Sequence, residues 1–171
     1  MELNKTLERQ AKRLNACADG RNSLLALNDK NDMVRLYLHH IDFCLMNDYP
    51  SNEFIRENFV GVMERYGVNL DDDVELDDMK KIVALGKTMI RANYKGYAVG
   101  EMFVKHDSSA NIVAHGNAFV MVDAFDHAVV HVCAHDRARV CVNVYGDAHV
   151  DVVKQDDGAH VRIVNKNKKT Y

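Results

Sequence analysis

The chain has 171 residues, with 22 Lys and Arg against 25 Asp and Glu, nine His, four Cys, one Pro and no Trp. This length fits one domain, or two small ones that share a core. The 47% hydrophobic and 27% charged content excludes wholesale disorder. No apolar run approaches the ~20 residues of a membrane span, and neither half has the strong basic excess typical of non-specific nucleic-acid binding.

The N-terminal segment contains no apolar signal core, so we expect a cytoplasmic protein. The four cysteines, Cys17, Cys44, Cys133 and Cys141, form no CxxC pair. Free thiols in a reducing compartment are therefore expected. The spacing leaves open a disulfide bond between Cys133 and Cys141.

Apolar residues with helical spacing predict three amphipathic helices within a helical region at residues 1–67. The first is expected to end at Gly20. The second spans residues 32–48 and ends before Pro50, whose ring disfavours a helical conformation at the preceding residue. The third begins with Ser51 as its N-cap. We expect this region to cap the structure that follows.

Six of the eight residues from Asp71 to Asp78 are acidic. An EF-hand loop that began at Asp71 would need Gly at its sixth position and Glu at its twelfth, where this chain has Leu76 and Ile82. The segment is therefore not expected to bind calcium. We predict a solvated acidic connector over residues 68–81.

The second half of the chain alternates with a period of two residues, which is typical of β-strands. Small aliphatic residues occupy the even positions: Ala118, Val120, Val122, Ala124, Ala128, Val130, Val132, Ala134, Ala138, Val140, Val142, Val144, Ala148, Val150 and Val152. A ten-residue repeat is superimposed, with corners that read Phe125-Asp126-His127-Ala128, His135-Asp136-Arg137-Ala138 and Tyr145-Gly146-Asp147-Ala148. Asp and Gly at matched corners indicate turns.

This repeat predicts an α+β fold in which the helical region is followed by a β-solenoid at residues 82–164. Ten residues are too few to close a coil of two strands and two turns, so we expect about 20 residues per coil. The stacked pairs would be Phe125 over Tyr145, His131 over Asp151 and His127 over Asp147. An antiparallel meander would also keep the aliphatic face on one side and stays open as the alternative.

The alternation shifts by one residue at Asp156-Asp157-Gly158, after which Ala159, Val161 and Ile163 form the inner series. An odd insertion turns every later side chain to the other face unless a bulge or a longer turn absorbs it. We therefore predict an irregularity at residues 156–158. Residues 165–171 are expected to form a basic, solvated tail.

The corner pattern followed by x-Val-x-Val/Ala resembles the Ala-x-Val-x-Ala repeats of small, mostly uncharacterised bacterial and phage-associated β-solenoid proteins. The resemblance covers about residues 98–164. It implies a solenoid shape and a phage or mobile-element origin, and it transfers no functional residue.

His131, Cys133 and His135 are metal-ligating residue types on one strand face. The first and third are about 13 Å apart in a strand, so they cannot readily share one ion. We expect no metal site and no cofactor. Motifs for nucleotide binding, zinc proteolysis and serine hydrolysis are absent, so no catalytic residue is assigned.

The sequence therefore predicts a non-catalytic interaction protein that presents a rigid solenoid face to a protein partner or to a second copy, with no membrane partner. Phe119, Met121 and Phe125 form the most apolar outward cluster. The full set of candidate binding residues is Phe119, Met121, Phe125, His131, Cys133, His135 and Tyr145. The alternative is a small carbohydrate hydrolase whose carboxylates are drawn from Asp123, Asp136, Asp147 and Asp151.

Overall fold

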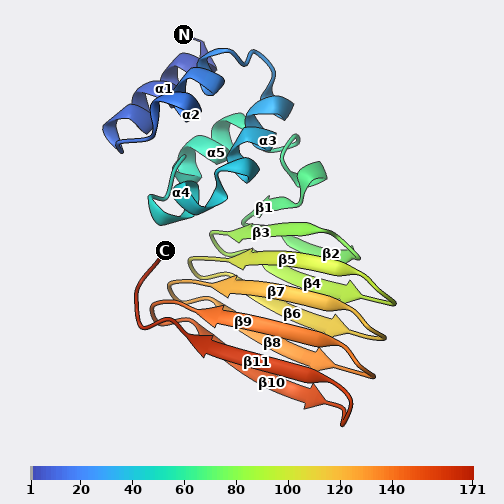
Figure 1. The fold of residues 1–171 in the computed structure, drawn as a ribbon. Helices are drawn as coiled ribbons and strands as arrows, with labels where there is room; N and C mark the ends of the chain where they lie inside the picture. The colour runs from blue at the N-terminus through green and yellow to red at the C-terminus, as the bar shows by residue number, and fades with distance from the viewer. Residues whose placement is uncertain (1) are drawn as a thin grey trace. The chain divides into compact units, whose positions relative to one another are not determined.

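The computed structural model describes residues 2–171. Two compact units make up the chain, a helical unit of residues up to 66 together with Tyr171, and a β unit of residues 67–170 (Figure 1). None of the helices in the described chain combines the length and the apolar character needed to cross a membrane. The two units are described separately.

The helical unit contains five short α-helices and one turn of 3-10 helix. They are α1 (Leu3–Arg13), α2 (Ala18–Leu25), α3 (Lys30–His39), α4 (Ile41–Met46), α5 (Asn52–Asn58) and η1 (Glu64–Tyr66). The expectation of three helices was therefore wrong in two places. The first helix ends at Arg13 because Asn15 adopts a left-handed backbone with φ of 60°, and Gly20 lies inside α2. The second is divided at His40, whose φ and ψ of −110° and 35° interrupt the helix.

Ser51 is the N-cap of α5, as predicted, and its hydroxyl accepts a hydrogen bond from the Phe54 N–H at 3.3 Å. Buried polar contacts hold the helices of this unit together. The amide of Asn4, which is 5% exposed, donates to the carbonyl oxygens of Leu25 and Leu27 at 3.0 and 2.8 Å. The Tyr49 hydroxyl donates to the Leu7 carbonyl at 2.9 Å. Polar groups buried in this way are stabilising only while they stay paired.

The β unit is a solenoid of eleven strands in about five coils (Figure 1). The strands are β1 (Val68–Leu70), β2 (Asp73–Asp77), β3 (Lys81–Leu85), β4 (Met89–Tyr94), β5 (Val99–Val104), β6 (Ser109–Ala114), β7 (Phe119–Ala124), β8 (Val129–Ala134), β9 (Arg139–Val144), β10 (His149–Gln155) and β11 (His160–Asn165). Odd-numbered strands form one sheet, here sheet A, and even-numbered strands form the other, sheet B. Every pairing is parallel, which excludes the meander.

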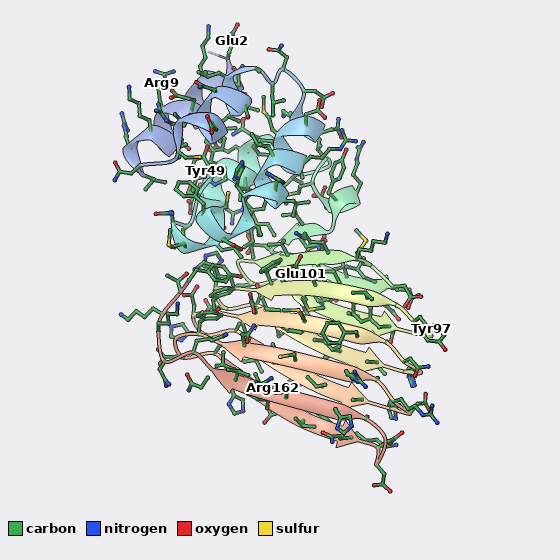
Figure 2. All side chains as sticks on the ribbon, in the orientation of Figure 1. Glu2, Arg9, Tyr49, Tyr97, Glu101 and Arg162 are labelled. Atoms are coloured by element: carbon green, nitrogen blue, oxygen red, sulfur yellow. The ribbon has the colours of Figure 1, made fainter. Side chains whose placement is uncertain are left out.

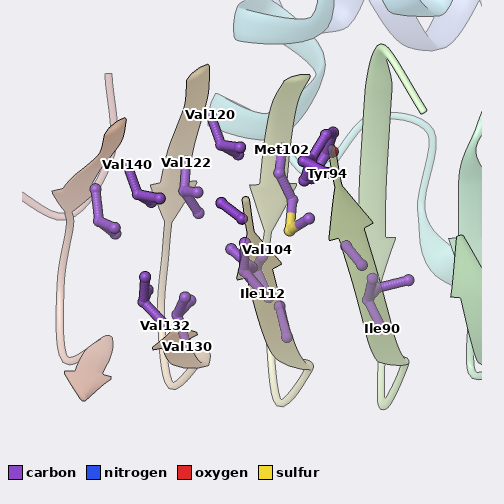
Figure 3. Packing of buried hydrophobic residues seen from close by; sticks show 14 of the residues in the cluster. Ile90, Tyr94, Met102, Val104, Ile112, Val120, Val122, Val130, Val132 and Val140 are labelled. Carbon is purple, nitrogen blue, oxygen red and sulfur yellow. The ribbon is translucent and has the colours of Figure 1, made fainter. Parts of the chain in front are cut away.

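Residues 20 apart are paired in the central coils, for example Val120 with Val140 in sheet A and Ala110 with Val130 in sheet B. This confirms the predicted solenoid with about 20 residues per coil. The even-numbered residues of strands β4 to β9 face inward and fill the space between the two sheets (Figure 3). Val122 and Val132 are fully buried, and burial of a side chain of this kind contributes about 1.5–3 kcal/mol.

Each corner of the central coils is a tight four-residue turn. The Ala at the fourth position donates its N–H to the carbonyl of the first residue, as in Ala128 to Phe125 and Ala138 to His135, both at 3.0 Å. The second residue of the turn has a positive φ, between 57° and 67° at Gly116, Asp126, Asp136 and Gly146 among others. Gly and Asp tolerate this left-handed conformation, which explains why these two residue types alternate at the corners.

Side chains at the corners also connect successive coils. The Asp136 carboxylate accepts the N–H of Gly116 at 2.8 Å, and the Asp156 carboxylate accepts the N–H of Asp136 at 3.2 Å. At the other corner the Asp126 carboxylate accepts the His106 N–H at 3.2 Å, and the His106 imidazole accepts the Gly86 N–H at 3.1 Å. Each of these Asp and His side chains therefore satisfies a backbone donor of the coil before it.

The predicted acidic connector at residues 68–81 was wrong, because it forms β1 and β2, the first coil of the solenoid. This coil is shorter than the others, since Val68 pairs with Val83 and Asp73 with Met89. The acidic residues of β2 are exposed, whereas Val74 and Leu76 between them pack against the core. A period-two pattern of apolar residues within the charged run was the signal for a strand.

The predicted irregularity exists, but it lies three residues earlier than expected. The pairing of β10 with β8 shifts between Val152 and Lys154, so the extra residue, Val153, is accommodated by a β-bulge. Residues 21 apart are paired thereafter, as in His160 with Arg139. Ala159 is buried, in agreement with the shifted inner series.

One inner position differs in size from the rest. Tyr94 occupies the position that is Ala114 in the next coil, and its fully buried ring lies over Gly100. The Tyr94 hydroxyl donates to the Met79 carbonyl at 3.0 Å, and burial raises the pKa of this phenol to about 12. A Cβ atom at residue 100 would overlap the Tyr94 ring. The buried ring of Tyr94 therefore requires glycine at position 100.

We expect Gly100→Val to destabilise the protein by about 1–3 kcal/mol through overpacking against Tyr94. In the double variant Gly100→Val/Tyr94→Ala the loss should be clearly smaller than the sum of the two single losses, because it restores the residue types of the following coils. Urea unfolding followed by circular dichroism measures these differences, with Val99→Ala as the control. Additive losses would contradict the coupling.

A second prediction concerns Asp156. Its pKa lies below the ordinary value because its carboxylate accepts the Asp136 N–H and, in addition, lies 3.2 Å from the His135 imidazole. A group with a lowered folded-state pKa stabilises the fold above about pH 4, and this contribution is lost as the pH falls through the folded value. We expect Asp156→Asn to be less stable than the wild type at about pH 5, with the difference shrinking by about pH 2.5.

Thermal unfolding at both pH values measures this change, with the exposed Asp157→Asn as the matched control. A stability difference that is the same at both pH values would show that the charge of Asp156 has no role.

Candidate functional site

The outer face of sheet A contains an open groove of about 850 Å³. It is lined by Asp78, Lys80, Lys95, Tyr97, Ala98, Val99, Gly100, Glu101, Phe119 and Met121. All of these residues belong to the solenoid unit. Strands β5 and β7 form the floor of the groove, and the corner between β4 and β5 forms one side.

Four large apolar side chains are exposed in this groove. Tyr97 is 85% exposed, Val99 61%, Met121 42% and Phe119 38%. Val99 pairs with Phe119 and Glu101 pairs with Met121, so these residues are cross-strand neighbours on one face. Tyr97 projects from the corner at the edge of the same sheet (Figure 2). We call these four residues the apolar patch.

Charged side chains surround the apolar patch. Glu101 forms an ion pair with Lys81 at 2.9 Å, and the Asp78 carboxylate accepts the Lys95 backbone N–H at 2.8 Å. The Lys95 ammonium lies 3.9 Å from Asp77, with both side chains largely exposed. Lys80 forms no ion pair with any residue that the structure describes. The acidic groups of the rim are therefore engaged within the chain, whereas Lys80 remains the more available charge.

Two of the predicted binding residues, Phe119 and Met121, lie in this groove. Phe125 and Tyr145 do not, because they stack on one another at a corner, with ring centroids 4.7 Å apart. This confirms the predicted column. Phe125 is fully buried and Tyr145 is 5% exposed, so neither ring is accessible to a partner and their assignment as binding residues was wrong. A stacked pair closes the corner where smaller residues would leave a void.

The remaining predicted residues lie away from the groove, on sheet B and its following corner. The His131 imidazole lies 3.4 Å from Asp151, which confirms that column, and the second oxygen of Asp151 lies 3.0 Å from His149. His135 stacks on His115 with centroids 4.6 Å apart. The proposed pair of His127 with Asp147 stays a prediction.

No group of three or more His, Cys, Asp or Glu residues in the described part of the chain could hold a metal ion. Cys133 projects outward from sheet B, opposite Lys154 of the next coil. It is separated from the His135 ring, which is engaged at the corner by His115 and Asp156. The fold thus does not bring His131, Cys133 and His135 together as metal ligands.

The disulfide that the sequence left open between Cys133 and Cys141 is not formed. Cys133 lies on β8 in sheet B and Cys141 on β9 in sheet A, and both occupy outward positions of their strands. The four described cysteines are all free. Cys44 is buried in the helical unit, and this burial raises the pKa of its thiol to about 12.

We expect iodoacetamide to modify Cys17, Cys133 and Cys141 in the native protein and to leave Cys44 unmodified, because a buried thiol with a raised pKa supplies almost no accessible thiolate. Mass spectrometry of proteolytic fragments measures the labelling, and the unfolded chain, labelled at all four positions, is the control. Native labelling of Cys44 at the rate of Cys17, or recovery of a fragment linked through Cys133 and Cys141, would contradict this assignment.

The four carboxylates of the hydrolase alternative are dispersed by the fold. Asp123 lies on sheet A, where it accepts a hydrogen bond from Asn143 at 2.6 Å. Asp151 lies on sheet B, and Asp136 and Asp147 lie at opposite corners. The fold therefore does not gather them into one catalytic cleft.

Tyr97 and Val99 were missed by the sequence analysis, although a signal was present. Lys95-Gly96-Tyr97-Ala98 matches the corner pattern of the later coils, with Gly96 at the left-handed second position. Extending the repeat upstream would have placed Tyr97 at an exposed corner position. It would also have placed Val99 on the outward face of a strand, in register with Phe119.

Comparisons with protein-family models, with curated proteins and with solved structures find no match to this chain. The resemblance to phage-associated repeat proteins therefore stays a prediction. Function has to be inferred from the geometry of the groove and the chemistry of its lining.

Proposed function

We propose that the chain is a non-catalytic interaction protein that binds a partner protein in the groove on the outer face of sheet A. The observation that carries this proposal is the apolar patch, four neighbouring exposed side chains on a regular sheet. Single exposed apolar residues are ordinary, but a contiguous group with a charged rim is typical of a protein interaction site. Aromatic residues such as Tyr97 are also the residue types that dominate binding energy at interfaces.

The scaffold beneath the patch favours tight recognition. Val120 and Val122, the inward residues of β7, are fully buried, and the outward Phe119 and Met121 alternate with them. A strand fixed on its inner side and paired on both edges has little freedom to lose on binding. Little of the binding free energy is therefore lost in ordering the site.

The rim indicates the chemistry of the partner. Glu101 is paired with Lys81, the Lys95 ammonium lies 3.9 Å from Asp77, and Asp78 accepts a backbone N–H, which leaves Lys80 as the available rim cation. The complementary ligand is a protein segment with an apolar side chain for the groove and acidic residues beside it. The hydrolase alternative has no comparable support, since its carboxylates are dispersed.

We expect Tyr97→Ala and Phe119→Ala each to weaken binding of the partner by about 30-fold, the effect of removing a strong interface residue. Partners are identified by affinity capture on the immobilised chain, and affinities are then measured by calorimetry with the purified partner. Met89→Ala, on sheet B and about as exposed as Phe119, is the matched control and should bind normally.

Lys80→Glu should weaken the same interaction and reduce its dependence on salt, because it removes a rim cation. The proposal fails if every captured protein binds the Tyr97 and Phe119 variants as well as the wild type. It also fails if Met89→Ala reduces binding to the same extent.

A further inference from the structure

The last coil of the solenoid leaves its inner side chains open to solvent. Val152 is 41% exposed and Ile163 is 46% exposed. The equivalent residues of the preceding coil, Val132 and Val142, are fully buried. The apolar interior of the solenoid is thus accessible at this end, on a surface distinct from the apolar patch of sheet A.

The backbone at this end is also unpaired. Strand β10 pairs with β8 and β11 pairs with β9, and no other described strand pairs with either of them. After β11 the chain does not continue beneath β10, because it turns back along the corner (Figure 1). There the Lys168 carbonyl accepts the N–H of Gly146, and Asn167 adopts a left-handed backbone. Two neighbouring strand edges therefore present free N–H and C=O groups.

Exposed strand edges usually carry features that prevent pairing, such as Pro, an inward charge or a covering loop. The inward positions of β10 and β11 hold Val150, Val152, Val161 and Ile163, with the polar Gln155 and Asn165 only at the C-terminal ends, and neither strand contains Pro. The bulge at Val153 affects the C-terminal half of β10 only. The unpaired edges of β10 and β11 and the exposed apolar side chains between them are therefore complementary to a second surface of the same composition.

We infer that this end of the solenoid binds the same end of a second copy of the chain. A two-fold axis parallel to the strands and perpendicular to the solenoid axis places β10 of one copy against β11 of the other. Because β10 and β11 run in opposite directions within one copy (Figure 1), the strands of the two copies meet antiparallel and both sheets continue across the interface. The exposed valine and isoleucine side chains of the two last coils then form one closed interior. Closed two-fold contact also prevents the end-to-end growth that open edges would otherwise allow.

Charges at the rim favour a particular pairing of strands. Asp151 is the outward acidic residue of β10 and Arg162 is the outward basic residue of β11 (Figure 2 labels Arg162). When β10 lies against β11 of the second copy, Asp151 can face Arg162 while Val152 faces Val161. Pairing of each strand with its own copy would bring the two Arg162 side chains together. The surface is therefore self-complementary in both its apolar and its charged parts.

Sedimentation equilibrium of the purified chain tests this inference. A mass of twice 19.4 kDa is expected. Ile163→Lys should weaken the dimer by about 100-fold or more, because it buries a charge at a symmetric contact. Ile163 is already half-exposed, so the monomer is expected to keep its fold, which circular dichroism checks. Val99→Lys, on the outer face of sheet A, is the matched control and should remain dimeric.

Hydrogen exchange on the wild type provides a second measurement that needs no substitution. Amides of β10 and β11 should gain protection as the concentration rises through the dimer range, while those of β5 and β7 should not change. A wild type that is monomeric at about 100 μM, a dimer that survives Ile163→Lys, or filaments in place of a closed pair would each overturn the inference. None of these outcomes bears on the groove of sheet A, whose test uses a different partner and different variants.

Discussion

The solenoid depends on one constraint, a thin interior that admits small side chains from two facing sheets. A coil closes in 20 residues only if each half contributes a strand and a tight corner, and ten is an even number. The inward face is therefore preserved from one half-coil to the next, and Val120, Val130 and Val140 meet in the same dry layer. Burial of this layer is the main source of stability.

The corners meet a second requirement, which is to satisfy the backbone where the strands end. A left-handed residue turns the chain, and the same residue can use its side chain to accept an N–H from the coil before it, as Asp126 and Asp136 do. Asp serves both purposes, whereas Gly serves only the first.

Three departures from the regular repeat distinguish this solenoid. The first coil is shortened, the last contains a bulge at Val153, and Tyr94 with Gly100 replaces two residues of ordinary size. The groove of sheet A lies beside that pair. A regular repeat with outward residues free to vary can thus carry a distinct surface on each coil without changing its core.

The sequence by itself determined the solenoid, its coil length and the inward series, because these follow from period two and period ten, which are properties of neighbouring residues. It failed where long-range geometry decides. Phe125 and Phe119 look alike in the sequence, yet one is buried in a corner stack and the other is exposed in the groove. The place of the bulge depends on which strand lies alongside β10. Only the tertiary structure brings Tyr97 next to Phe119, because their proximity arises from stacking across coils and not from spacing along the chain.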